Sequence, residues 1–234
     1  DIIKAIASEL NVRNNQVEAA VKLIDEGCTI PFISRYRKEA TGALNDEQLR
    51  NLDERLKYLR NLEDKKAQVI ASIAEQGLLT DELKNQIEKA DTMVAVEDLY
   101  RPYRPKRRTR ATIAKEKGLE PLANVILLQM TGEPVVKTAE EYVSEEKDVK
   151  TPEDAVAGAK DIIAESISDN ADYRTRIREL TFKEGVLTSA AKDAEAKTVY
   201  EMYYNFSEPA AKMAGHRILA VNRGENEKIL TVKI

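Results

Sequence analysis

Aromatic side chains are scarce in this sequence of 234 residues. They make up 5% of it, and tryptophan is absent. Sandwiches and barrels usually contain many aromatic and β-branched residues, so this shortage argues against an all-β fold. Leucine, isoleucine, valine and alanine supply most of the apolar content, and charged residues reach 33%. Together these proportions predict a mainly α-helical protein.

The sequence also lacks most of the residues from which active sites are built. Cys28 is the single cysteine and His216 the single histidine, so there is no pair for a disulfide and no ligand set for zinc or iron. A catalytic triad fails for the same reason. The nine glycines are scattered and form no phosphate-binding loop. We therefore expect no catalytic residue, no metal and no cofactor.

Long apolar runs are missing too, and no basic-then-apolar leader opens the sequence. A membrane-spanning helix needs roughly 20 apolar residues, so we expect no membrane association. A single cysteine is consistent with a reducing compartment, and the expected location is the cytoplasm. The sequence begins without methionine and stops within a strand-like run from Ile229 to Ile234, which suggests a part of a longer polypeptide.

The net charge of −4 argues against a protein that coats nucleic acid with its whole surface, but it leaves room for a local basic patch. Residues 101–110 form such a patch, which we call the basic arm. They hold six of the 37 basic residues and none of the 41 acidic ones. Pro102 and Pro105 disfavour helix at the residues before them, so we expect the basic arm to be extended or turned.

The basic arm is the main candidate for contact with nucleic acid. Arginine and lysine neutralise phosphates, and tyrosines beside them offer rings on which unpaired bases stack. The candidate contact residues are Tyr100, Arg101, Tyr103, Arg104, Lys106, Arg107, Arg108 and Arg110. The alternative is that these cations pair with carboxylates of the protein's own fold, such as Glu97 or Asp98.

A second set of candidates is Arg35, Arg37, Lys38, Arg174, Arg178 and Lys183. The first three lie in an aromatic and basic stretch, residues 31–42, and the last three in an expected helix over residues 169–184. A structural role is the alternative for the first stretch. Phe32, Ile33 and Tyr36 have a spacing that would bury one side of a short helix.

One long helix is expected over residues 45–76. Asn45 has the position of an N-cap, with Gln48 three residues later. Leucines recur at three- and four-residue steps from Leu49 to Leu62. At about 1.5 Å per residue the helix would span roughly 45 to 50 Å, so we expect an elongated molecule. The alternative use of the leucine stripe is the seam of a coiled-coil dimer.

Shorter helices are expected on both sides of the long one. They begin at or near Ile2, Asn14, Thr80, Thr92, Pro121, Thr151 and Asp169. Residues 216–222 are expected to form a short helix followed by a strand, or else the first arm of a hairpin. The predicted fold is mainly α, an elongated multi-helix assembly with a short β element at the C-terminal end. We expect residues 1–148 to form a first module and residues 149–234 a second helical segment.

Several stretches of the sequence resemble the N-terminal region of the Tex family of bacterial transcription accessory proteins. The stretches that carry the resemblance are 12–24, 31–42, 49–62, 97–103, 106–111, 216–220 and 223–227. The resemblance implies a mostly helical N-terminal module. In the full-length family members this module is followed by a ribonuclease-H-like domain, helix-hairpin-helix motifs and a C-terminal OB-fold that binds RNA. It supplies no catalytic residue to transfer.

The sequence therefore gives one functional hypothesis and one alternative. The hypothesis is a non-catalytic scaffold region of a Tex-like transcription accessory protein that itself binds RNA or single-stranded DNA. The alternative is a structural or protein-interaction platform for the transcription machinery, with nucleic acid bound only by the C-terminal OB-fold domain. We expect neither a membrane partner nor a small-molecule cofactor.

Overall fold

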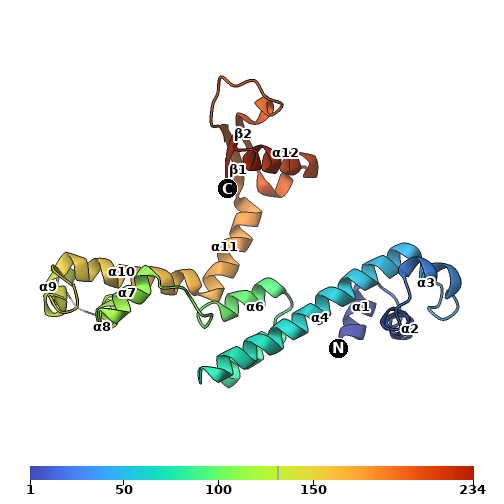
Figure 1. The fold of residues 1–234 in the computed structure, drawn as a ribbon, viewed down its shortest axis with the longest axis horizontal. Helices are drawn as coiled ribbons and strands as arrows, with labels where there is room; N and C mark the ends of the chain where they lie inside the picture. Colours follow the sequence, from blue (N-terminus) through green and yellow to red (C-terminus); the bar gives the residue numbers. More distant parts are fainter. Residues whose placement is uncertain (131) are drawn as a thin grey trace. The chain divides into compact units, whose positions relative to one another are not determined.

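The computed structural model describes residues 1–130 and 132–234, which form two compact units. The first unit runs from Asp1 to Tyr103 and the second from Arg104 to Ile234. Helices predominate in both, and a small sheet lies toward the C-terminus (Figure 1). The expected fold class, mainly α with a short β element at the C-terminal end, is confirmed. The elongation expected for the whole chain stays a prediction.

Six helices make up the first unit. They are α1 (Ile2–Glu9), α2 (Asn14–Asp25), α3 (Ile30–Tyr36), α4 (Asp46–Glu75), α5 (Asp81–Lys89) and α6 (Met93–Tyr100). The N–H of Gln48 donates to the Asn45 side chain at 2.8 Å, and the Asn45 N–H donates to the Gln48 side chain at 3.0 Å. Thr80 and Thr92 cap α5 and α6 with their hydroxyl groups. These three predicted helix starts are confirmed.

The long helix α4 contributes to two hydrophobic cores. Leu52 and Leu56 are buried with residues of α1, α2 and α3, whereas Leu62 and Ile73 are buried with residues of α5 and α6. Burial of such side chains is the main stabilising contribution to a fold. The leucine stripe, which the sequence left open to a coiled-coil seam, therefore packs within its own chain.

The described residues of the second unit form helices and three strands. The elements are α7 (Arg110–Glu116), α8 (Glu120–Leu128), α9 (Val135–Ala139), η1 (Glu140–Tyr142), α10 (Pro152–Asp169), α11 (Ala171–Glu184), β1 (Val186–Ala191), η2 (Glu201–Tyr203), β2 (Asn205–Pro209), η3 (Ala210–Lys212), α12 (Gly215–Asn226) and β3 (Leu230–Lys233). Helix α11 connects α10 with the sheet (Figure 1).

One core of the second unit joins α7, α8 and α10. Leu119, just before α8, and Ala155 of α10 are both buried in it. The sequence places a boundary after residue 148, between α8 and α10. The contacts divide the chain between Tyr103 and Arg104 instead, because this core crosses residue 148 and ties α7 and α8 to α10.

The other core of the second unit lies between the sheet and α12. The strand order is β2-β1-β3 with antiparallel pairing, and Ser189 of β1 lies opposite Phe206 and Val232. Tyr200 and Tyr203 are buried in this core. The expected helix and following strand are present as α12 and β3. The sequence did not predict β1 and β2, because an inward position such as Ser189 carries a small polar residue and weakens the alternation typical of a strand.

Candidate nucleic-acid interface

The basic arm divides at the boundary between the two units, between Tyr103 and Arg104. Its residues 101–109 lie outside helices, as its prolines predict, and Arg110 begins α7. Both Arg101 and Arg104 are exposed. The three residues before the boundary belong to the first unit and the other seven to the second.

Two tyrosines are among the candidate contact residues, Tyr103 in the basic arm and Tyr100 just before it, and both pack in the first unit. Tyr100 and Tyr103 are partly buried against the core of α4, α5 and α6. The Tyr100 hydroxyl lies 3.0 Å from the Ser72 hydroxyl, and the Gln76 amide donates to the Tyr103 carbonyl oxygen at 2.9 Å. The Lys65 ammonium lies 5.9 Å from the centre of the Tyr100 ring. Both tyrosines thus support the fold, and their contact with bases stays a prediction.

An acidic stripe on α10 holds the part of the basic arm that lies in the second unit. Asp161, Glu165 and Asp169 follow at four-residue steps and share one face of the helix. Lys106 forms ion pairs with Asp169 and, at 3.6 Å, with Glu165. The Thr109 hydroxyl donates to Glu165 at 2.9 Å and also caps α7. These contacts fix the arm from Lys106 to the start of α7.

Three arginines of the anchored segment keep exposed side chains. Arg107 is exposed and forms no ion pair within the described part of the chain. Arg108 pairs with Glu116 at 2.7 Å, where both side chains are more than half exposed. Arg110 is 86% exposed and lies 3.8 Å from Asp161. Because exposed pairs contribute only about 0 to 1 kcal/mol, these guanidinium groups exchange easily to another anion.

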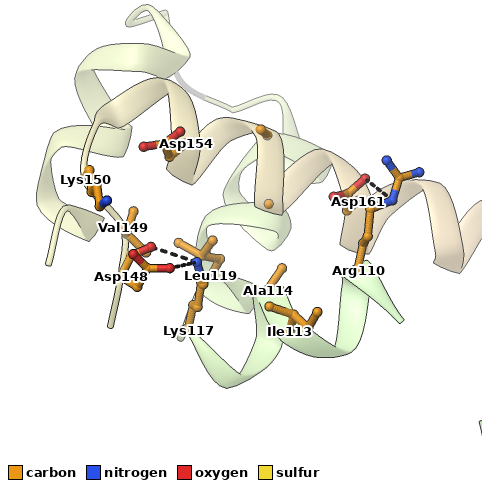
Figure 2. A pocket seen from close by; sticks show the side chains of 12 residues that line it. Arg110, Ile113, Ala114, Lys117, Leu119, Asp148, Val149, Lys150, Asp154 and Asp161 are labelled. Atoms are coloured by element: carbon orange, nitrogen blue, oxygen red, sulfur yellow. Dashed lines mark hydrogen bonds and ion pairs between the residues drawn. The ribbon is translucent and has the colours of Figure 1, made fainter. Parts of the chain in front are cut away.

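Arg110 also borders a pocket of about 400 Å³ that lies between α7 and α10 (Figure 2). The Lys117 ammonium donates to the carboxylate of Asp148 at 3.0 Å and to its carbonyl oxygen at 2.7 Å. The hydrogen bond from Lys117 to the Asp148 carboxylate lowers the pKa of Asp148 below its ordinary value. Asp154 and Asp161 add two further carboxylates to the lining. Arg110, Lys117 and Lys150 supply as many cations, so the charges of the lining balance and the pocket has no excess of positive charge for a phosphate.

The second basic stretch, residues 31–42, occupies α3 and the loop that follows it. Arg35, Arg37 and Lys38 are exposed. None of the three forms an ion pair with any residue that the structure describes. These cations are therefore available to an external anion.

Helix α3 turns one narrow stripe toward the core. Ile33 is fully buried and Ile30 partly buried, whereas Phe32 and Tyr36 are 37% and 61% exposed. The expectation that both rings share the buried side with Ile33 is wrong, because a seven-residue helix presents only one such stripe. The signal in the sequence was the three-residue step from Ile30 to Ile33, which places the two rings on a neighbouring face.

The remaining candidates lie on α11. The Arg174 guanidinium donates to the Ser168 carbonyl oxygen at 3.3 Å. Arg174 and Arg178 line a hollow of about 310 Å³ together with apolar residues such as Ile177. Lys183 is exposed in the last turn. Arg174 and Arg178 therefore border apolar surface, and contact of the three cations with nucleic acid stays a prediction.

Other chemistry is sparse in the described residues. No three histidine, cysteine, aspartate or glutamate side chains among them are grouped so that they could hold a metal ion. Cys28 is a free thiol that packs beside the core of α1 to α4, and His216 is exposed on α12. None of the described helices combines the length and apolar character needed to cross a bilayer.

Comparison with known protein families gives two matches along the chain. The Tex-like protein N-terminal domain matches residues 1–74, and the Tex central region-like domain matches residues 131–234. The chain belongs to the Tex family. The family expected from the sequence motifs is thus confirmed, and the basic arm of this Tex chain lies between the two matched regions.

Relatives of the Tex chain occur in bacteria and in humans. An uncharacterized protein of Bacillus subtilis is 51% identical over 232 residues, which cover 98% of the chain and 32% of the relative. Transcriptional accessory protein Tex of Neisseria gonorrhoeae is 43% identical over 237 residues, covering 100% of the chain and 31% of that protein. Human S1 RNA-binding domain-containing protein 1 is 30% identical over 244 residues, covering 100% of the chain and 24% of that protein. The chain spans about a third of the length of these bacterial relatives.

Proposed function

We propose that this chain is a non-catalytic nucleic-acid-binding scaffold region of a Tex-like transcription accessory protein, with RNA or single-stranded DNA as its ligand. One observation carries the proposal. Lys106 is committed to the acidic stripe of α10, while Arg107, Arg108 and Arg110 keep exposed guanidinium groups beside it. Residues 106–110 are thus held in place by α10, and three of their arginine side chains are exposed to solvent.

Charge and geometry support contact with phosphates. A guanidinium group forms two parallel hydrogen bonds to a phosphate, which are stronger than neutral ones. Arg108 and Arg110 form only weak surface pairs with their carboxylate partners. A phosphate can therefore replace those carboxylates at the two guanidinium groups at little cost in free energy. Fixing the segment beforehand lowers the entropy lost on binding.

The names of relatives agree with this proposal. One relative is named a transcriptional accessory protein, and another is named for an S1 RNA-binding domain. A cytoplasmic location and the absence of catalytic activity belong to the same proposal. They are supported by the sequence composition, which offers one cysteine, one histidine and no phosphate-binding loop.

A salt titration of binding tests the proposal. Each phosphate neutralised on a single strand contributes about −0.7 to the slope of log affinity against log salt, so three contacts contribute about −2. The Arg107→Gln, Arg108→Gln, Arg110→Gln variant is expected to lose most of that contribution. The Lys192→Gln, Lys197→Gln, Lys212→Gln variant removes the same charge from exposed positions elsewhere in the unit and should keep the slope. Equal slopes in the wild type and the arginine variant would remove the basic arm from the binding site.

A protein-interaction platform is the second candidate, and one observation favours it. No residue of α11, all of which the structure describes, is buried. Tyr173, Ile177, Leu180 and Phe182 are exposed along it. Exposed apolar side chains on a helix that buries none of its residues favour a further contact with a partner. If the platform is the true role, RNA will leave the melting temperature of the chain unchanged.

A further inference from the structure

Helix α3 exposes two aromatic rings on one face. Phe32 and Tyr36 are four residues apart, and their ring centres lie 5.4 Å apart at an interplanar angle of 46°. Contiguous exposed apolar surface often marks an interaction site. The tilt means that the two rings are not stacked face to face on each other.

Cations surround these rings. The Arg37 guanidinium lies 5.1 Å from the centre of the Phe32 ring, and the Arg35 guanidinium lies 6.0 Å from that of Tyr36. Lys38 follows directly. Elsewhere in the same unit, arginines that serve the fold pair with carboxylates, as Arg55 does with Glu9. The cations near α3 form no ion pair with a carboxylate among the described residues. The Arg37 guanidinium donates to the Tyr36 carbonyl oxygen at 3.2 Å, a contact with the neighbouring residue alone.

The loop after α3 is held in place. The Thr41 N–H donates to the Arg37 carbonyl oxygen at 3.1 Å, and its hydroxyl donates to the same oxygen at 3.3 Å. The Gln16 side chain donates to the Gly42 carbonyl oxygen at 2.9 Å. Gly42 has a φ of +60°, a conformation that glycine adopts without strain. The cations and rings thus project from a fixed support, which favours binding without reordering.

We propose that Phe32 and Tyr36, with Arg35, Arg37 and Lys38 around them, form a base-stacking platform for single-stranded nucleic acid. The inference rests on the proposed nucleic-acid binding and names its ligand class at this surface. Unpaired bases have open faces that stack on aromatic rings, whereas bases in a duplex are already stacked on one another. The interleaved cations neutralise the phosphates that connect those bases.

Anisotropy titrations of the 234-residue chain test the platform. The probes are a labelled short oligothymidylate, an abasic strand with the same number of phosphates, and a duplex of the same length. The wild type is expected to bind the oligothymidylate at least about tenfold more tightly than the abasic strand, since each stacked base adds to affinity without adding charge. The Phe32→Leu, Tyr36→Leu variant is expected to lose that preference while keeping the salt slope.

Matched variants separate stacking from damage to the fold. Tyr173→Leu with Phe182→Leu removes two exposed rings from α11, which are 52% and 74% exposed, and should leave binding unchanged. Phe32→Tyr with Tyr36→Phe retains both rings and should bind as the wild type does. Circular dichroism should give the same melting temperature for all variants, because none of the four rings is buried.

The outcomes distinguish two failures. If the wild type binds no oligonucleotide at low salt, the proposed function and the platform both fall. If it binds oligothymidylate and the abasic strand equally, or if the leucine variant at positions 32 and 36 binds as the wild type does, only the platform falls. Displacement of the oligothymidylate by an acidic polypeptide at equal charge concentration would likewise overturn it in favour of a protein partner.

Discussion

The basic arm and the stretch at residues 31–42 have similar composition and different surroundings. Both combine arginine and lysine with aromatic residues. Lys106 of the arm is bound to the acidic stripe of α10, and the arm's tyrosines pack on α4. In the other stretch, Phe32 and Tyr36 are exposed and the cations have no carboxylate partner among the described residues. Composition alone thus does not reveal which rings are open to a ligand.

The residues one helical turn earlier explain why Tyr100 is partly buried and Tyr36 is exposed. Tyr100 and Tyr36 are each the last residue of a helix, α6 and α3. Four residues before Tyr100 lies Val96, which is buried, so the ring continues a core-facing stripe. Four residues before Tyr36 lies Phe32, which is exposed, so this ring continues an outward face.

Removing the anchor of the basic arm is expected to have the largest effect on stability. Lys106→Ala removes the ammonium that pairs with Asp169, which is buried and keeps a further interaction. A buried charge that loses one of its partners costs about 1 to 3 kcal/mol. Urea denaturation, with hydrogen exchange of the α7 and α10 amides as the local probe, should show this loss in the second unit.

Arg107→Ala is the matched control, because Arg107 is exposed and forms no ion pair with a described residue. Its free energy of unfolding should stay within about 0.5 kcal/mol of the wild type. If both substitutions cost the same, Lys106 is not an anchor and the contrast between the two stretches disappears.

Removing single hydroxyl groups should give a smaller difference in the free energy of unfolding, here between variants at Tyr100 and Tyr36. Tyr100→Phe loses the contact with Ser72, which is expected to cost about 0.5 to 1.5 kcal/mol. Tyr36→Phe changes an exposed ring and should cost less than about 0.5 kcal/mol. Urea midpoints of the two variants check the order. A larger loss for Tyr36→Phe would show that the α3 ring is the one that serves the fold.

The smallest effect on stability is expected from removing the ion pairs between arginines and carboxylates in the first unit. This effect depends on pH. Arg55 and Arg60 hydrogen-bond Glu9 and Asp25, and these bonds lower the pKa values of the two carboxyl groups from their ordinary 4.5 and 3.8. Because the folded pKa values are the lower ones, the stabilisation is present above about pH 4.5 and is lost as the pH falls through the folded values.

Urea midpoints at several pH values measure this effect. The difference between the wild type and a Glu9→Gln, Asp25→Asn variant should be constant near neutral pH and shrink in acid. An Arg35→Gln, Arg37→Gln variant removes arginines that have no carboxylate partner among the described residues, so its difference should not change with pH. A constant difference for the carboxyl variant would mean that these pairs add nothing to stability.

Local signals in the sequence predicted much of the fold. Side-chain caps such as Asn45, Thr80 and Thr151 mark helix starts within the chain itself, so the α4, α5 and α10 starts could be predicted. Strands β1 and β2 depend on pairing between residues far apart, and positions such as Ser189 give them little local pattern. The unit boundary likewise depends on long-range packing.

For the candidate site, the sequence predicted which residues are basic but not how the fold uses them. The anchoring of Lys106 depends on Asp169, which is 63 residues further along the chain. The exposure of Tyr36 depends on which face of α3 meets α2 and α4. Neither relation is visible in composition or in the spacing of either stretch alone.

Photo-crosslinking of a thiouridine-containing single-stranded RNA to the chain, with the modified peptides mapped by mass spectrometry, tests most directly which rings meet bases. We expect most adducts at Phe32 or Tyr36, whose rings are exposed, and fewer at Tyr100 or Tyr103, whose side chains are partly buried against the core. Adducts at Tyr100 or Tyr103 with none in α3 would contradict the assignment of base contacts to the exposed rings.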